Sequence, residues 1–290
     1  SYVWIVRKSL KRDNFKGSLI AKVLYICLTT SFIVQLLINA NLLVLLLTFV
    51  IAGLLQAGKI PVETDMGYKY NISSQGLVWG ITGLITILAL LAFYWQGRVW
   101  IADYYFRQSL LAAQENKGAE TYNLQIKAIK LNPYNENYRI SYSNTNLALA
   151  NSLASQSDLT DQEKANINQL ISQAIREAKS ATVLNPQISY YWVNLANIYR
   201  NVINAAEGAE QWAASAYLQA VRTDPTNPIL RVDFGGLFFA LKNFDQAIIQ
   251  FTQSVNLKPD YANGYYNLAS AYREKQDWVN AFANMQQAIS

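Results

Sequence analysis

Residues 228–290 read PILRVDFGGLFFALKNFDQAIIQFTQSVNLKPDYANGYYNLASAYREKQDWVNAFANMQQAIS and contain one pattern twice, at an interval of 34 residues. Positions within the pattern are counted from Pro228 in the first copy and from Ala262 in the second. Positions 7, 8, 11, 20 and 24 are occupied in the first copy by Phe234, Gly235, Phe238, Ala247 and Phe251, and in the second by Leu268, Ala269, Tyr272, Ala281 and Met285.

This pattern predicts a pair of antiparallel helices in each copy. Small residues at positions 8 and 20 allow two helices to approach closely, and large residues at positions 7, 11 and 24 fill the space around that contact. Pro259, at position 32, ends the second helix because proline has no amide hydrogen. The pattern resembles the tetratricopeptide repeat (TPR), which implies a right-handed solenoid of stacked helix pairs with a curved inner face.

The same phase extends toward the N-terminus. Prolines preceded by Asn or Asp recur at Pro225, Pro186 and Pro133. They divide the preceding sequence into three further units, which are Ala102–Asn135, Glu136–Ile188 and Ser189–Asn227.

The two units nearest the N-terminus depart from the pattern. Ala102–Asn135 has Gln108 and Ser109 at positions 7 and 8, and Glu136–Ile188 has a surplus that predicts longer helices. The sequence from Thr160 to Glu163 predicts a capping box at the start of a helix that ends near Leu184. We therefore predict an all-α fold, in which residues 102–290 form a TPR-type right-handed α-solenoid of about five helix pairs.

The front third of the chain has a different composition. Residues 1–101 hold nine Lys and Arg against three Asp and Glu, so the net charge of +5 arises there, and the near-neutral remainder argues against a nucleic-acid partner. A basic stretch beside long apolar runs is typical of membrane proteins. Residues 1–101 are therefore predicted to be a transmembrane region in contact with the lipid bilayer, with helices at about 18–38, 42–57 and 77–97. The last of these is expected to continue directly into the first solenoid helix.

Residues 1–57 also resemble a known family. An apolar helix end, a short basic loop, a helix rich in small residues and a Leu-rich helix follow one another here. This order is similar to the last part of the O-antigen ligase/polymerase family of bacterial membrane glycosyltransferases. The resemblance implies that the chain is the C-terminal part of such an enzyme and that the catalytic loop lies upstream of Ser1. The chain has no histidine, so the family's catalytic histidine has no counterpart here.

The distribution of basic residues also predicts a topology. If the loop Arg7–Lys16 is cytoplasmic, three crossings place the solenoid outside the cytoplasmic membrane. If residues 18–57 cross only once, the solenoid is cytoplasmic instead. We expect a multi-pass protein of the cytoplasmic membrane with an extracytoplasmic TPR domain.

The inner face of the solenoid is the predicted binding groove. In a curved stack of this kind the first helix of each pair lines that face. Positions 2, 5, 9 and 12 of these helices place six residues in a candidate groove for a peptide or protein partner, or for a glycan stacked on tyrosine rings: Asn144, Tyr190, Asn197, Arg200, Tyr266 and Arg273. The same positions include Ile140 and Val232. The alternative is that these are ordinary solvated or core-edge residues. Tyr265 and Trp278 are expected to be exposed on the last helix pair and to mark a contact with more chain or a partner.

No catalytic chemistry is predicted for the chain itself. The sequence shows no glycine-rich phosphate loop, no metal-ligand cluster and no nucleophile beside a base, so we expect neither a catalytic residue nor a cofactor. Three hypotheses remain: a fragment of a glycan ligase or polymerase with an interaction domain, a membrane-anchored TPR scaffold without enzymatic activity, and a cytoplasmic-facing adaptor.

Overall fold

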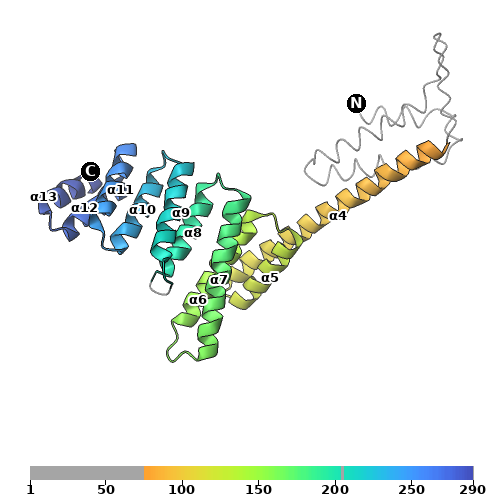
Figure 1. Cartoon of the computed structure of the whole chain (residues 1–290), viewed down its shortest axis with the longest axis horizontal. Coiled ribbons are helices and arrows are strands. Elements are labelled where there is room, and N and C mark those ends of the chain that lie inside the picture. Colours follow the sequence, from red (N-terminus) through yellow and green to blue (C-terminus); the bar gives the residue numbers. More distant parts are fainter. Residues whose placement is uncertain (1–74, 204–205, 290) are drawn as a thin grey trace, which may run out of the picture. The chain divides into compact units, whose positions relative to one another are not determined.

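The computed structural model describes residues 75–203 and 206–289, and all regular elements in these ranges are α-helices (Figure 1). The chain divides into two compact units, Ser1–Gly97 and Arg98–Ser290. The helices are α4 (Gln75–Gln114), α5 (Gly118–Leu131), α6 (Glu136–Ala154), α7 (Asp161–Leu184), α8 (Ser189–Asn201), α9 (Ala209–Thr223), α10 (Pro228–Ala240), α11 (Phe244–Leu257), α12 (Ala262–Glu274) and α13 (Trp278–Ile289).

Within Arg98–Ser290 these helices form a stack of antiparallel pairs. From α6 onward, each helix packs most extensively against its partner in the pairs α6–α7, α8–α9, α10–α11 and α12–α13. The part of α4 from Arg98 and the whole of α5 form the first pair, in which Ala102 and Ala128 are fully buried. The prediction of an all-α helical repeat is thus confirmed for the described residues.

Prolines follow the second helix of each of the first four pairs. Asn132, Asn185, Asp224 and Lys258 each precede a proline and have extended φ values between −132° and −142°. The proline ring forces this conformation because it clashes with a helical preceding residue. The capping box predicted at Thr160 is also present: its side chain accepts from the Glu163 amide, and Glu163 accepts from the Thr160 amide.

Among the described residues, each turn between the two helices of a pair includes a residue in the left-handed region. Asn116, Lys242 and Gln276 have φ values of 59°, 58° and 62°, and all three stand at position 15 of their units. In the longer turns of the second and third units, Asp158 and Gly208 take this conformation instead, with φ values of 59° and 75°. A left-handed residue reverses the chain in few residues, so the turn geometry repeats even where the sequence does not.

The close contact between positions 8 and 20 sets the spacing within each pair. Gly235 and Ala247 are buried at these positions in the fourth unit, and Ala196 and Ala213 are buried at the corresponding places in the third. In the second unit the contact is polar, since the hydroxyl of Ser143 donates to the carbonyl oxygen of Ala174 at 2.7 Å. The predicted role of small residues at these positions is thus seen in the packing of the helices.

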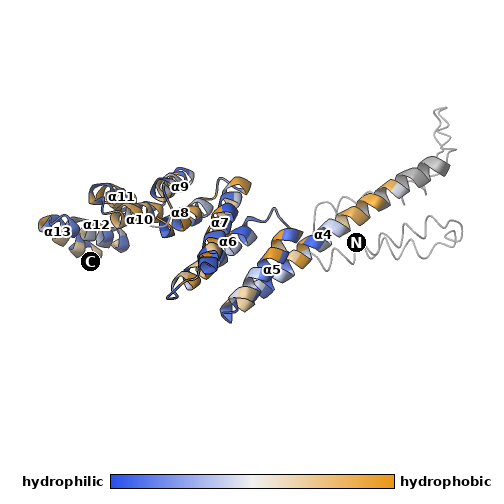
Figure 2. Ribbon diagram, turned by 60° about the horizontal axis from the view of Figure 1, so that its bottom comes forward, coloured by the Kyte–Doolittle hydropathy of each residue, from blue (hydrophilic) through white to orange (hydrophobic). Residues whose placement is uncertain are grey.

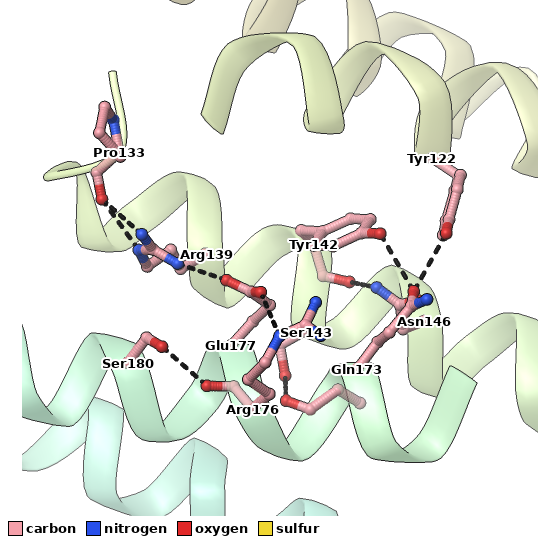
Figure 3. Close-up of polar contacts among 11 residues, drawn as sticks. Tyr122, Pro133, Arg139, Tyr142, Ser143, Asn146, Gln173, Arg176, Glu177 and Ser180 are labelled. Carbon is pink, nitrogen blue, oxygen red and sulfur yellow. Dashed lines mark hydrogen bonds and ion pairs between the residues drawn. The ribbon is translucent and has the colours of Figure 1, made fainter. Parts of the chain in front are cut away.

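A polar seam holds α6 against α7 (Figure 3). The guanidinium of Arg139 lies 2.5 Å from the carboxylate of Glu177, whose side chain is only 8% exposed. Tyr122 and Tyr142 both donate to the amide oxygen of Gln173, at 3.0 and 3.1 Å. Burial, followed by the contact with Tyr122, raises the pKa of Tyr142. This pair of helices is therefore aligned by specific hydrogen bonds as well as by apolar packing.

Helix α4 contains the predicted third membrane crossing at 77–97. The helix runs unbroken from Gln75 to Gln114, so the predicted continuity of 77–97 with the first solenoid helix is observed. Many of its described apolar side chains are exposed, and the middle of the helix is strongly hydrophobic in Figure 2.

None of the helices in the described part of the chain, however, is long and apolar enough to cross a membrane. The crossing predicted at 77–97 is therefore not supported, and those at 18–38 and 42–57 lie outside the described residues.

Candidate functional site: the A-helix face

The candidate site is the side of the stack formed by α6, α8, α10 and α12, which are the first helices of their pairs. We call it the A-helix face. The exposed residues on this face include all six that the sequence predicted: Asn144, Tyr190, Asn197, Arg200, Tyr266 and Arg273. Ile140 and Val232, expected on the same face, are instead buried at 3% and 9% exposure. Ile140 packs with Ala181 and Tyr191, so this position turns into the core.

Two asparagines connect α6 to α8 across this face. The side-chain amide of Asn194 donates to the side-chain oxygen of Asn144 at 2.7 Å. Asn144 stands at position 9 and Asn194 at position 6, so position 9 of one A helix meets position 6 of the next. In the repeat numbering, Asn197 on α8 and Asp233 on α10 hold the equivalent positions, as do Gly236 on α10 and Asn267 on α12.

A polar cluster surrounds Arg200, which is exposed near the end of α8. The buried hydroxyl of Tyr217 donates to the side-chain oxygen of Asn197 at 2.6 Å, which directs the amide hydrogens of Asn197 away from that bond. A guanidinium nitrogen of Arg200 lies 3.7 Å from the place where a Cβ of residue 236 would stand. Arg200 therefore reaches across to α10 beside Gly236.

Asp233 adds an acidic group to this cluster. Burial raises the pKa of its carboxyl, and the positive charge of Arg200 opposes this effect only in part. Burial similarly raises the pKa of Tyr217, again against the influence of Arg200. We call Asn197, Arg200, Tyr217 and Asp233 the Arg200 cluster. It places hydrogen-bond donors and a carboxylate acceptor side by side, which suits the alternating amides and carbonyls of an extended peptide.

The remaining predicted residues lie elsewhere along the face. Tyr190 is 56% exposed at the start of α8 and meets the ring of Tyr191 edge-on. Tyr266 is 55% exposed on α12. Arg273, also on α12, is paired with the neighbouring Glu274 at 3.1 Å. The structure thus brings Asn197 and Arg200 into one cluster and distributes the other four residues along the stack.

Position 6 is what the sequence reasoning missed. Asn194, Asp233 and Asn267 occupy it in three successive units, and two of these side chains take part in the contacts described above. A signal for them was present, because polar residues recur at one position on an otherwise apolar helix side. Among the described residues, no group of three or more His, Cys, Asp or Glu side chains could hold a metal ion.

Comparison with known proteins bears on the repeat. A family model described as "TPR repeat" matches residues 235–276, which extend from α10 to the end of α12. The chain contains a TPR repeat. Its stack of helix pairs is accordingly a TPR-type fold, as the 34-residue pattern predicted. No curated protein matches the sequence.

Solved TPR-type structures resemble the chain at low sequence identity. A crystal structure of MamA has 16% identity and a TM-score of 0.48, covering 65% of this chain and 90% of its own. MamA from Desulfovibrio magneticus RS-1 has 11% identity and a TM-score of 0.49, covering 65% and 93%. A thermophilic TPR protein of Thermus thermophilus, TTC0263, has 19% identity and a TM-score of 0.46, covering 65% and 90%. The comparisons give no support to the predicted resemblance to O-antigen ligases, which concerns residues outside the described part of the chain.

Proposed function

We propose that the chain is a TPR-type scaffold that binds an extended segment of a partner protein along the A-helix face. The observation that carries this proposal is the Arg200 cluster. It leaves a charged guanidinium, an amide and a carboxylate on the same exposed face, between the pairs α8–α9 and α10–α11. Of the three hypotheses from the sequence, the non-enzymatic scaffold is the one that the TPR match supports.

The raised pKa of Asp233 strengthens this assignment. A carboxylate whose ionised form is disfavoured by burial reduces the stability of the fold at neutral pH. Groups that reduce stability persist where they serve binding, because function and stability are often in conflict at such sites. A peptide amide that donates to Asp233 would replace the hydrogen bonds from water that the carboxylate loses on burial.

Peptide selection tests the groove. Peptides that bind the full chain are selected from a random library, and their binding is then measured on the native chain, on the double variant Asn197→Ala/Arg200→Ala and on the control Val183→Ala. Val183 is 79% exposed on α7, which is not an A helix. Peptides enriched on the native chain should bind the double variant at least about tenfold more weakly and the control unchanged. Equal binding to all three proteins would refute the A-helix face as the binding site.

We further propose that the region before the solenoid attaches the scaffold to a membrane. The support is compositional: two long apolar segments at 18–38 and 42–57 follow a basic stretch, as in membrane proteins. Flotation of the full chain with liposomes tests it. Co-flotation that survives high salt and alkaline carbonate is expected, since apolar insertion is insensitive to both. Recovery of the chain in the pellet or the aqueous fraction would contradict it.

A further inference from the structure

An apolar hollow of about 360 Å³ lies between α12 and α13. Its apolar lining comes from Ala269, Trp278, Ala281, Phe282 and Met285, and Ser270 and Arg273 of the A-helix face line it as well. Trp278 and Phe282 are 63% and 66% exposed, and none of the described residues of α13 is buried. Tyr265, predicted to be exposed with Trp278, is instead partly buried and packs against the core cluster of α11 and α12. A large apolar surface in water marks an interaction site.

The equivalent surface on α11 lies inside the stack, where the next helix covers it. A shift of 34 residues relates Ala281, Phe282 and Met285 to Ala247, Ile248 and Phe251 on α11. There Ala247 and Phe251 are 0% and 1% exposed, because Leu268 and Ala271 of the following A helix pack into one cluster with them. The hollow on α12–α13 therefore has the form that receives the A helix of a further unit.

The chain has an A helix whose corresponding side is exposed. A shift of 160 residues places Ala102–Gln114 of α4 in register with Ala262–Glu274 of α12. Tyr104, Gln108 and Leu111 then correspond to Gly264, Leu268 and Ala271, which are all buried in α12. On α4, Ile101, Tyr104 and Leu111 are instead 49%, 59% and 52% exposed. We call these three residues, with Gln108, the α4 stripe.

We propose that copies of this chain associate head to tail, with the α4 stripe of one copy covering the α12–α13 hollow of the next. This contact has the same form as the interface between α11 and α12, in which an A helix covers Ala247 and Phe251. Because two different surfaces meet, each copy keeps one of them available, and the association continues beyond a dimer. The A-helix face of one copy would then continue into that of the next.

Two charge substitutions test this contact on the full chain, purified in a mild detergent. Tyr104→Glu blocks the stripe and Phe282→Glu blocks the hollow, and both residues are exposed, so the fold should be retained. The native chain should form species larger than a dimer by light scattering and sedimentation. Each variant alone should weaken self-association at least about tenfold, because a charge would be buried in an apolar contact. Val183→Glu, at an exposed apolar residue on α7, should associate like the native chain.

Mixing the two variants gives the decisive measurement. The Phe282→Glu chain keeps an intact stripe and the Tyr104→Glu chain keeps an intact hollow, so an equimolar mixture should form dimers and nothing larger. Circular dichroism melting checks that each variant is folded. If a glutamate variant does not fold, the serine variant at the same residue, Tyr104→Ser or Phe282→Ser, is used in its place. A native chain that stays monomeric at micromolar concentrations would overturn the proposal. Association that survives both substitutions would also overturn it. Failure of the two variants to pair in the mixture would do the same, because it would mean that like surfaces meet or that another protein segment covers the hollow.

Discussion

Gly235 on α10 faces the ring of Phe251 on α11 so closely that a Cβ added to it would lie 2.5 Å from the nearest ring carbon. Phe251 is 1% exposed and cannot move aside without disturbing Leu268 and Ala271 of the next helix. The two residues stand at positions 8 and 24 of the repeat. Their contact therefore joins the spacing within one pair to the packing between pairs.

Replacing Gly235 should consequently destabilise the stack. Gly235→Leu is expected to lower the free energy of unfolding by about 3 kcal/mol or more, because overpacking a core contact displaces both helices. Gly235→Ala should lower it less, since only one methyl group must be accommodated. Urea unfolding followed by circular dichroism at 222 nm measures both effects.

The adjacent glycine provides a matched control. A Cβ at residue 236 would meet only Arg200, at an ordinary distance of 3.7 Å. Gly236→Ala should therefore leave the stability unchanged or raise it by up to about 1 kcal/mol, because alanine favours the helix. If both alanine variants behave alike, the close contact with Phe251 does not limit the packing.

Asp233→Asn should stabilise the protein at neutral pH. The folded state raises the pKa of Asp233 above its ordinary value of 3.8, so the folded protein binds this proton more tightly than the unfolded chain does. The associated stability is present below pH 3.8 and is lost as the pH rises through the higher folded pKa. The asparagine variant should exceed the native protein in stability at pH 7, and the difference should shrink on acidification. Urea unfolding over that pH range measures it, and a constant difference would contradict the burial of this charge.

Breaking the ion pair between α6 and α7 should be costly. Arg139→Met removes the more buried of the two arginines that contact Glu177, whose side chain is 8% exposed, and leaves only Arg176, which is 64% exposed. Loss of one partner from a buried charge is expected to cost up to about 3 kcal/mol. The double variant Arg139→Met/Glu177→Leu should recover much of this loss, because no buried charge remains. Thermal melting of the two variants provides the comparison. An equal loss in both would mean that Arg139 acts chiefly through its bonds to the Pro133 carbonyl oxygen.

Thr160→Ala should loosen the start of α7. The substitution removes the side-chain acceptor for the Glu163 amide, which lies 3.3 Å from it, and loss of such a cap costs about 1 kcal/mol. Hydrogen exchange of the first turn of α7 should accelerate, while Thr160→Ser keeps the acceptor and should leave exchange as it is. Unchanged protection in the alanine variant would show that the neighbouring helix turns supply the stability.

Much of the helical stack was predictable, because its signals are local. The prolines at 133, 186, 225 and 259 restrict the residue before them, and the capping box at Thr160 involves only four residues. The small residues at positions 8 and 20 repeat at a fixed interval. Each of these features acts within one unit or at its boundary, where the sequence alone carries the information.

The site was less predictable, because it depends on contacts between units. The spacing that assigned Asn197 and Arg200 to the groove, where both are exposed, also included Ile140, which is buried against Ala181 and Tyr191. Asp233 was overlooked because it belongs to the Arg200 cluster only when α8 and α10 lie side by side. Its burial, and with it the raised pKa, is a property of two helices that are 27 residues apart at their nearest ends.

The left-handed residue in each turn has a practical consequence for protein engineering. The longer turns of the second and third units also include such a residue, Asp158 and Gly208, so added length in a turn is compatible with the stack of paired helices. Loop tips of this kind tolerate insertion well. A fluorescent reporter or an affinity tag placed beside Asp158 would mark the protein in cells while keeping both faces of the stack open.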